Sequence, residues 1–146
     1  MRLITFLFLI GLLAACSSVS PSQPAGSGSG GQGGGATLSS TPTPETLTLG
    51  KGETQTLTVS VTRTSPEVAK VRLDITEGAD VLVSPNSLFV TFEEGDTATA
   101  ELQVSVGASP SPGNANPFFY IYGQPLNEKG KSVGGGTPKL SYQWSL

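Results

Sequence analysis

The sequence predicts an all-β fold, an antiparallel sandwich or barrel, over residues 45–146. Apolar and polar residues alternate with a period of two in several runs of this region, as they do in strands that bury one face. Turn-forming residues separate the runs at intervals of about 8 to 12 residues, which is typical of sandwiches and barrels. Beyond residue 13 no stretch repeats its apolar residues with the helical period of about 3.6.

The first expected strands are residues 47–49, 54–62 and 68–76, with a glycine-containing turn at residues 50–52. Each run places its apolar side chains on one side and its hydroxyl or charged side chains on the other, so one face is buried and the other is solvated. The residues expected on the buried face are Leu47, Leu49, Leu57, Val59, Val61, Ala69, Val71, Leu73 and Ile75.

Two shorter strands and one long strand follow. Residues 81–83 and 88–92 flank a turn that contains Pro85. An acidic turn at residues 93–96 then leads into residues 97–106, the longest alternation in the chain. The residues expected to point inward are Leu88, Val90, Phe92, Ala98, Ala100, Leu102, Val104 and Val106.

The last two expected strands are rich in aromatic residues. In residues 118–122, Phe118, Tyr120 and Tyr122 share one side, and Phe119 and Ile121 share the other. If the second pair enters the core, the three rings form a surface stripe, and flat exposed rings of this kind can stack on sugars. The alternative is that the long loop 123–138 covers the stripe, or that neighbouring elements cover both sides of the strand.

In the final run, residues 139–146, apolar and aromatic residues alternate with serine and glutamine. We expect Trp144 to pack inside the sandwich, with its indole N–H donating to a backbone carbonyl. The alternative is that Trp144 forms part of a ligand-binding platform.

Four short segments resemble bacterial Ig-like domains, which occur in surface proteins and beside secreted enzymes. The segments are Thr-Leu-Thr-Val-Ser-Val-Thr at 56–62, Val-Ser-Pro-Asn-Ser-Leu at 83–88, Thr-Ala-Glu-Leu-Gln-Val-Ser-Val at 99–106 and Ser-Pro-Gly at 111–113. The resemblance covers about residues 45–146 and implies an Ig-like sandwich of about seven strands with a binding, spacing or adhesive role. The chain departs from the family pattern at residues 114–117 and in the long loop 127–138.

The N-terminal segment is typical of an export signal. One positive charge at Arg2 precedes an apolar run over residues 3–13. This run is too short to cross a hydrocarbon core of about 30 Å as a helix, which takes roughly 20 residues. A signal peptide over residues 1–15 is therefore expected. The alternative, an uncleaved membrane helix, does not fit the serine, proline and glycine that follow.

Cys16 is the only cysteine of the chain, so no disulfide can form within it. The tetrapeptide Leu13-Ala14-Ala15-Cys16 resembles the lipobox of bacterial lipoproteins. The resemblance implies that a signal peptidase recognises Leu13, Ala14 and Ala15 and cuts before Cys16, whose sulfur carries diacylglycerol in a thioether, usually joined by a third acyl chain. It also implies a lipid-anchored protein of the cell envelope. Because Ser17 is not the aspartate that retains lipoproteins at the inner membrane, the outer membrane is expected where the bacterium has two membranes.

Residues 16–44 are expected to form the acylated cysteine and a flexible linker, because Ser17 to Pro44 consist almost wholly of Ser, Gly, Pro, Thr, Gln and Ala. Such a composition buries too little apolar surface to offset its chain entropy. A phosphate-binding glycine loop would need a preceding strand and a following helix, and neither is predicted.

Composition excludes several function classes. The net charge is −3, and the lysines and arginines are scattered, which argues against a nucleic-acid partner. The chain has no histidine, the commonest general base and transition-metal ligand. It also has neither a Gly-x-Ser-x-Gly nor a Ser-x-x-Lys motif. We therefore expect a protein without a cofactor that is not an enzyme.

The acidic turn suggests one metal site, with Glu93, Glu94 and Asp96 joined by Asp74 or Asp80. Calcium needs six to eight oxygen ligands, and this spacing matches no EF-hand loop. A solvated hairpin turn is the favoured interpretation, and no bound metal is expected.

Two classes of function remain. In one, the sandwich is an interaction or structural module that presents its edge strands and end loops to another envelope protein. In the other, it binds a glycan or the cell wall through Phe118, Tyr120 and Tyr122. The exposure of these rings distinguishes the two hypotheses.

Overall fold

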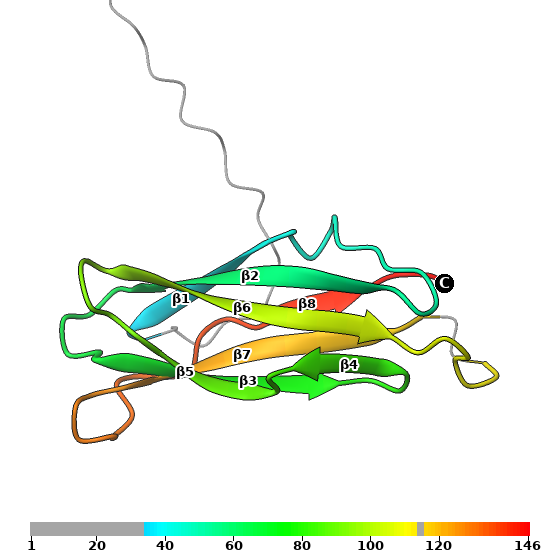
Figure 1. Cartoon of the computed structure of the whole chain (residues 1–146). Helices are drawn as coiled ribbons and strands as arrows, with labels where there is room; N and C mark the ends of the chain where they lie inside the picture. The colour runs from blue at the N-terminus through cyan, green and yellow to red at the C-terminus, as the bar shows by residue number, and fades with distance from the viewer. Residues whose placement is uncertain (1–33, 114–115) are drawn as a thin grey trace, which may run out of the picture.

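The computed structural model describes residues 34–113 and 116–146, which form a sandwich of two antiparallel four-stranded sheets (Figure 1). These residues contain no helix, so none of them forms a helical membrane span. The predicted all-β antiparallel sandwich is confirmed. The described chain has eight strands instead of about seven.

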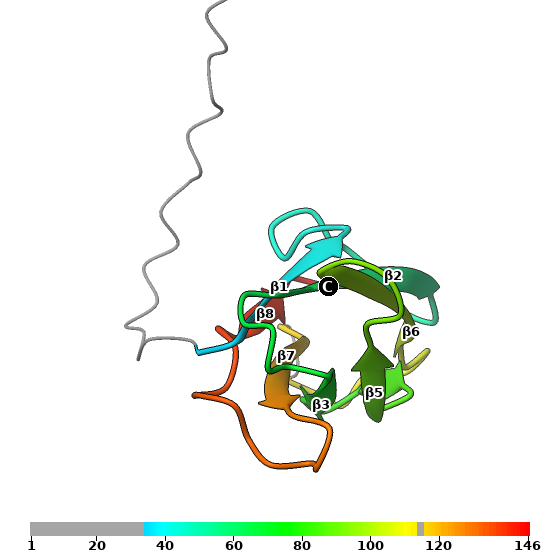
Figure 2. The same cartoon turned by 90° about the vertical axis from the view of Figure 1, so that its left-hand side faces the viewer.

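The first sheet has the strand order β1-β2-β6-β4, and the second has the order β5-β3-β7-β8. Viewed end-on, the strands of the two sheets enclose one core (Figure 2). In chain order the strands are β1 (Ala36–Thr41), β2 (Thr54–Arg63), β3 (Lys70–Glu77), β4 (Val81–Ser84), β5 (Ser87–Thr91), β6 (Thr97–Val106), β7 (Phe118–Leu126) and β8 (Leu140–Gln143).

The core lies between the sheets and contains most of the residues that the alternation placed inward. Ala69, predicted to point inward, is not part of the core, and its neighbour Val68 is buried there instead, because β3 begins only at Lys70. The side chains of Leu57, Leu73 and Leu102 are fully buried. Towards the edges of the core, Leu88 and Ala98 are partly buried and pack against it. Threonine and serine occupy most outward positions of β2 and β6, where their branched or small side chains suit a solvated pleat.

Strand β1 lies within the segment that the sequence assigned to a flexible linker. Ala36 to Thr41 pair with β2 in register, from Ala36 opposite Arg63 to Thr41 opposite Thr58. The predicted boundary at residue 45 is therefore wrong for residues 36–41, which belong to the sandwich. The strand carries no large apolar residue except Leu38, and its attachment comes from backbone pairing with a distant strand, which composition does not reveal. Residues 16–33 lie outside the described residues.

The short strand expected at residues 47–49 is also wrong, although the burial of its side chains was predicted correctly. Leu47 and Leu49 lie in the core, but their backbone joins neither sheet. A turn precedes them, in which the N–H groups of Thr46 and Leu47 both donate to the carbonyl of Thr43. The segment is thus an extended connection that fills the core from the side.

Three aromatic rings pack together in the core: Phe119 of β7, Tyr142 of β8 and Trp144, which follows β8. The ring of Phe119 stacks on that of Tyr142, with centroids 4.3 Å apart and planes inclined by 9°. Trp144 meets Phe119 edge-on, with centroids 6.2 Å apart. The indole N–H of Trp144 donates to the carbonyl of Leu49 over 2.8 Å, so the prediction of a buried tryptophan with a backbone acceptor is confirmed.

Tyr142 also joins the second sheet to β1. Its hydroxyl donates to Ser40 Oγ over 2.6 Å, and the Ser40 hydroxyl donates to the carbonyl of Pro42 over 3.0 Å. Burial of the Tyr142 side chain disfavours the phenolate and raises the pKa of Tyr142 from 10.0 to about 12.

We predict that Trp144→Ala lowers the free energy of unfolding by about 3 to 5 kcal/mol, because it removes a buried ring and leaves a cavity. Phe89→Ala is the control, since its side chain is 56% exposed, and it should cost less than about 1 kcal/mol. Urea denaturation of both variants measures the difference. Equal midpoints for Trp144→Ala and wild type would contradict the core assignment.

We predict that alkali destabilises the protein through Tyr142. The unfolded tyrosine ionises near pH 10, whereas the folded pKa is about 12, so the stabilisation is complete below pH 10 and is lost as pH rises towards 12. The loss amounts to about 3 kcal/mol, the equivalent of two pKa units. Denaturation of wild type and Tyr142→Phe between pH 8 and 12 tests this, and parallel profiles for the two proteins would contradict it.

Candidate binding face

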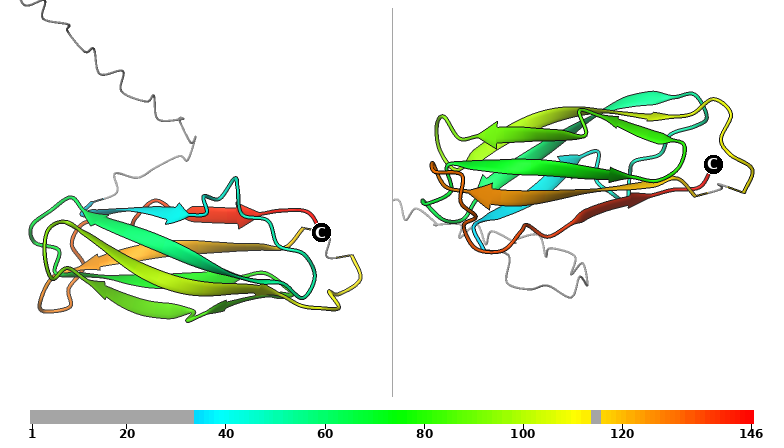
Figure 3. Two further views of the ribbon diagram at one scale, coloured as in Figure 1. Left: turned by 45° about the horizontal axis from the view of Figure 1, so that its top comes forward. Right: turned by 90° about the horizontal axis from the view of Figure 1, so that it is seen from below.

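The outer face of the second sheet carries the aromatic stripe that the sequence suggested. Because Phe119 and Ile121 enter the core, Phe118, Tyr120 and Tyr122 point to the outside of β7. The side chain of Phe118 is 43% exposed, while Tyr120 and Tyr122 are half-buried. β7 lies between β3 and β8, and the right-hand view of Figure 3 looks onto this sheet.

The edges of two of these rings pack closely against glycine residues. A Cβ atom at Gly136, in the loop between β7 and β8, would overlap Tyr122 Cε2. One at Gly78 would lie 2.7 Å from two ring atoms of Phe118. The loop thus covers part of Tyr122, as one of the sequence alternatives proposed, but it leaves Phe118 exposed.

Phe89 is a fourth ring on this face, and it was not among the residues predicted to bind a ligand. It points outward from β5 and lies opposite Arg72 of β3. The inward alternation of Leu88 and Val90 already required Phe89 to point outward, so this signal was present in the sequence. We call the outer surface formed by Phe89, Phe118, Tyr120 and Tyr122 the aromatic face.

Cationic side chains accompany these rings. Lys139 Nζ lies 4.3 Å from the ring centroid of Tyr120, and Lys70 Nζ lies 5.0 Å from that of Phe89. Both distances are within the roughly 6 Å over which a cation is attracted to a ring.

Arg72 is the third cation, and one acid balances part of the charge. Arg72 Nε donates to one carboxylate oxygen of Asp74 over 2.8 Å, while the Ser87 hydroxyl donates to the other over 2.9 Å. The outward positions of the second sheet, with Lys139 just before β8, therefore hold three cations and one acid.

The outer face of the first sheet has a different composition. Its two central strands present threonine, serine and glutamine, which bond across the strands, as in the 2.8 Å contact between Gln103 Nε2 and Thr56 Oγ1. On the outward positions of these two strands, from Thr54 to Thr62 and from Thr97 to Ser105, Glu101 is the only charged residue. We call this surface the hydroxyl face.

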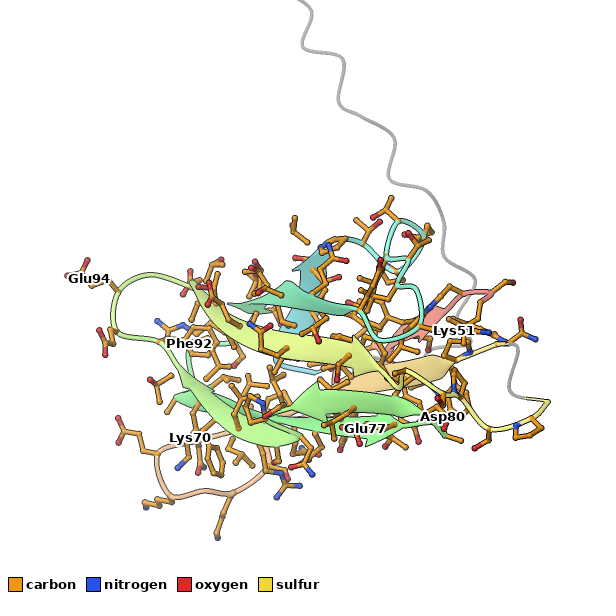
Figure 4. The ribbon with its side chains drawn as sticks, turned by 45° about the vertical axis from the view of Figure 1, so that its right-hand side comes forward. Lys51, Lys70, Glu77, Asp80, Phe92 and Glu94 are labelled. Carbon is orange, nitrogen blue, oxygen red and sulfur yellow. The ribbon has the colours of Figure 1, made fainter. Side chains whose placement is uncertain are left out.

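The acidic residues do not converge in the structure. Glu94 lies in a loop at one end of the sandwich, and Asp80 lies at the other end (Figure 4). Asp96 forms an ion pair with Arg63 over 2.8 Å, while Asp74 lies on β3. Among the described residues, no group of three or more potential acidic or thiol ligands is arranged to hold a metal ion.

The free sheet edges are short, which limits their use for strand addition. Each edge strand has between four and six residues. On β4, the N–H of Val83 already donates to Glu77 Oε1 over 2.6 Å. Short edges and satisfied edge groups are common protections against pairing with another chain.

The described chain enters and leaves the sandwich at opposite ends (Figure 1). At the entry, the N–H of Thr64 donates to the carbonyl of Gly35, near the loops that follow β2 and β7. The residues of the expected lipobox, Leu13, Ala14, Ala15 and Cys16, lie outside the described residues, so their role stays a prediction.

Shallow depressions occur at both ends of the sandwich. One lies between the connection before β2 and the C-terminal residues Ser145 and Leu146, and the other lies beside Arg63 and Phe92. In comparisons with known proteins, no family matches this chain, and no similar curated protein is found.

Proposed function

We propose that this chain is a lipid-anchored protein of the bacterial cell envelope, and that its sandwich is a non-catalytic Ig-like module that binds envelope material through the aromatic face. The observation that carries this proposal is the contrast between the two outer faces. One holds four rings and three cations, whereas the central strands of the other, β2 and β6, present hydroxyl and amide side chains with Glu101 as their one outward charge.

The strand order supports the Ig-like part of the proposal. Constant-type Ig domains have the sheets A-B-E-D and C-F-G. The order β1-β2-β6-β4 matches the first sheet, and β3-β7-β8 matches the second. The difference is β5, which adds an edge strand beside β3.

Anchoring is proposed from the resemblance of Leu13 to Cys16 to a lipobox, after an apolar run of signal-peptide length. With Cys16 acylated, the Ser/Gly-rich residues that follow suit a tether between the lipid and β1. The outer membrane is the proposed location where the bacterium has two membranes.

A glycan or the cell wall is the ligand that the aromatic face supports best. A flat ring can stack on the apolar side of a sugar, and Phe118, Tyr120 and Tyr122 follow one another at every second residue of a straight strand. Three such rings form a row about 14 Å long, since a strand advances about 3.4 Å per residue. This length suits an extended polymer.

A protein partner is the second candidate. Leu82 on β4 is 61% exposed on the outer face of the first sheet, and Phe89 on β5 is 56% exposed on that of the second. Apolar anchors of this kind dominate protein interfaces. Isolated exposed apolar residues are nevertheless normal on protein surfaces, and the short edges offer little backbone for pairing. We therefore place this function second.

We predict that cells fed a radioactive fatty acid label the wild-type protein and leave Cys16→Ala unlabelled, because only the Cys16 sulfur can carry the lipid. Ser17→Ala is the control and should keep its label. Immunoprecipitation followed by autoradiography reads the result. An unlabelled wild type, or label that persists in Cys16→Ala, would refute the anchoring proposal.

We predict that the full-length protein in detergent micelles cosediments with purified cell-wall material, and that Tyr120→Ala weakens this binding by about tenfold, the equivalent of about 1.4 kcal/mol. Thr58→Ala, on the hydroxyl face, is the control and should bind as wild type does. The bound fraction is measured against the amount of cell wall. If Tyr120→Ala binds as well as wild type, the aromatic face is not the binding surface.

A further inference from the structure

We infer that the ligand of the aromatic face is an acidic polysaccharide, whose carboxylate or phosphate groups bind Lys70, Arg72 and Lys139 while its sugar rings stack on the aromatic side chains. This inference rests on the proposed binding function and adds the chemical class of the ligand.

The charge distribution is the first argument. The chain as a whole is acidic, with 11 acids against 8 basic residues. The aromatic face reverses this balance, with three cations and one acid at its outward positions. A neutral sugar needs no such excess of positive charge, whereas an acidic one is attracted by it.

The positions of the lysines are the second argument. Lys139 lies over Tyr120, and Lys70 lies over Phe89. A sugar that stacks on either ring must displace the ammonium group sideways. The displaced ammonium then stays within side-chain reach of the sugar's substituents, so an acidic substituent exchanges a weak cation–ring contact for a stronger charge-assisted hydrogen bond.

Arg72 is the third argument. It lies between Phe89 of β5 and Gln124 of β7 in the sheet register. Its Nε atom donates a hydrogen bond to the Asp74 carboxylate, which fixes the guanidinium plane. The Arg72 side chain is 46% exposed. The outer nitrogens of a guanidinium can bind a carboxylate or phosphate through two parallel hydrogen bonds.

The same residue types also occur on membrane-binding surfaces, but the geometry favours a polymer. Membrane insertion requires apolar side chains that project from the surface. Tyr120 and Tyr122 are instead half-buried, and the Tyr122 hydroxyl is tied to Gln124 Oε1 over 2.7 Å. Tyr120 and Tyr122 are therefore held close to the sheet, where an extended chain can lie across them.

The test uses full-length protein in detergent micelles and two probes with the same sugar backbone, one charged and one neutral. Polygalacturonate carries a carboxylate on each sugar, and its fully methyl-esterified form has the same backbone without the charge. Binding to the immobilised protein is followed by interferometry. We expect polygalacturonate to bind at least tenfold more tightly than the ester in about 0.05 M NaCl, and this advantage to shrink in about 0.5 M NaCl as salt screens the charges.

Substitutions test whether polygalacturonate binds at the aromatic face. The double variant Lys70→Gln/Lys139→Gln should lower the affinity for polygalacturonate about tenfold and leave the affinity for the ester unchanged. Tyr120→Ala should weaken binding of both polymers. Lys51→Gln is the control that removes a positive charge elsewhere, because Lys51 lies at the end of the sandwich away from Lys70 (Figure 4). Thermal melting verifies that each variant is folded.

Several outcomes would overturn the inference. Equal affinity for the two polymers would do so while leaving the proposed binding function intact, and so would an equal loss in Lys51→Gln. Absence of binding to polygalacturonate would also overturn it. If Cys16→Ala protein, which has no lipid, binds vesicles containing phosphatidylglycerol, and the same protein with Lys70→Gln/Lys139→Gln does not, the inference is overturned and the face is a membrane-binding surface. Failure of the binding function itself is detected separately, by undiminished cell-wall binding of Tyr120→Ala.

Discussion

The stack of Phe119 on Tyr142 determines how the second sheet is built and what it presents. These rings lie in the core, where Trp144 meets Phe119 edge-on and where the Tyr142 hydroxyl reaches Ser40 of β1. A strand alternates strictly, and a shift of one residue would exchange its two faces. With Phe119 and Ile121 held inside, Phe118, Tyr120 and Tyr122 have to lie outside. The core contact therefore positions the aromatic face.

The sequence predicted those parts of the fold that depend on local alternation. The inward residues of β2, β3 and β6 follow from their own neighbours, and burial of Trp144 follows from its size and its place in an alternating run. The sequence failed where structure depends on distant partners. A Ser/Thr/Pro segment that has the composition of a linker becomes strand β1 because it pairs with β2, and Tyr142, 102 positions away, donates a hydrogen bond to its Ser40.

The candidate site shows the same division. That the three rings of β7 share one side was predictable from their spacing. The contribution of Phe89 was implied by alternation, but its place beside β3 depends on the pairing of β5 with β3, which no local pattern specifies. The contact between Lys139 and Tyr120 likewise requires the pairing of β7 with β8 across a long loop. Contacts between residues of different strands depend on the pairing register, and the register is a property of the whole fold.

Folding alone does not explain the composition of the aromatic face. Aromatic residues have high strand propensity, so a structural role for the outward rings has to be considered. Yet the central strands β2 and β6 of the same sandwich occupy equivalent outward positions with threonine and serine, which meet the strand preference without exposing rings. The core needs only the inward residues of β7. Rings such as Phe118 that stay exposed, and lysines such as Lys139 placed over them, add little to the core. Their presence on one sheet and their absence from the outward positions of β2 and β6 are therefore better explained by a ligand than by stability.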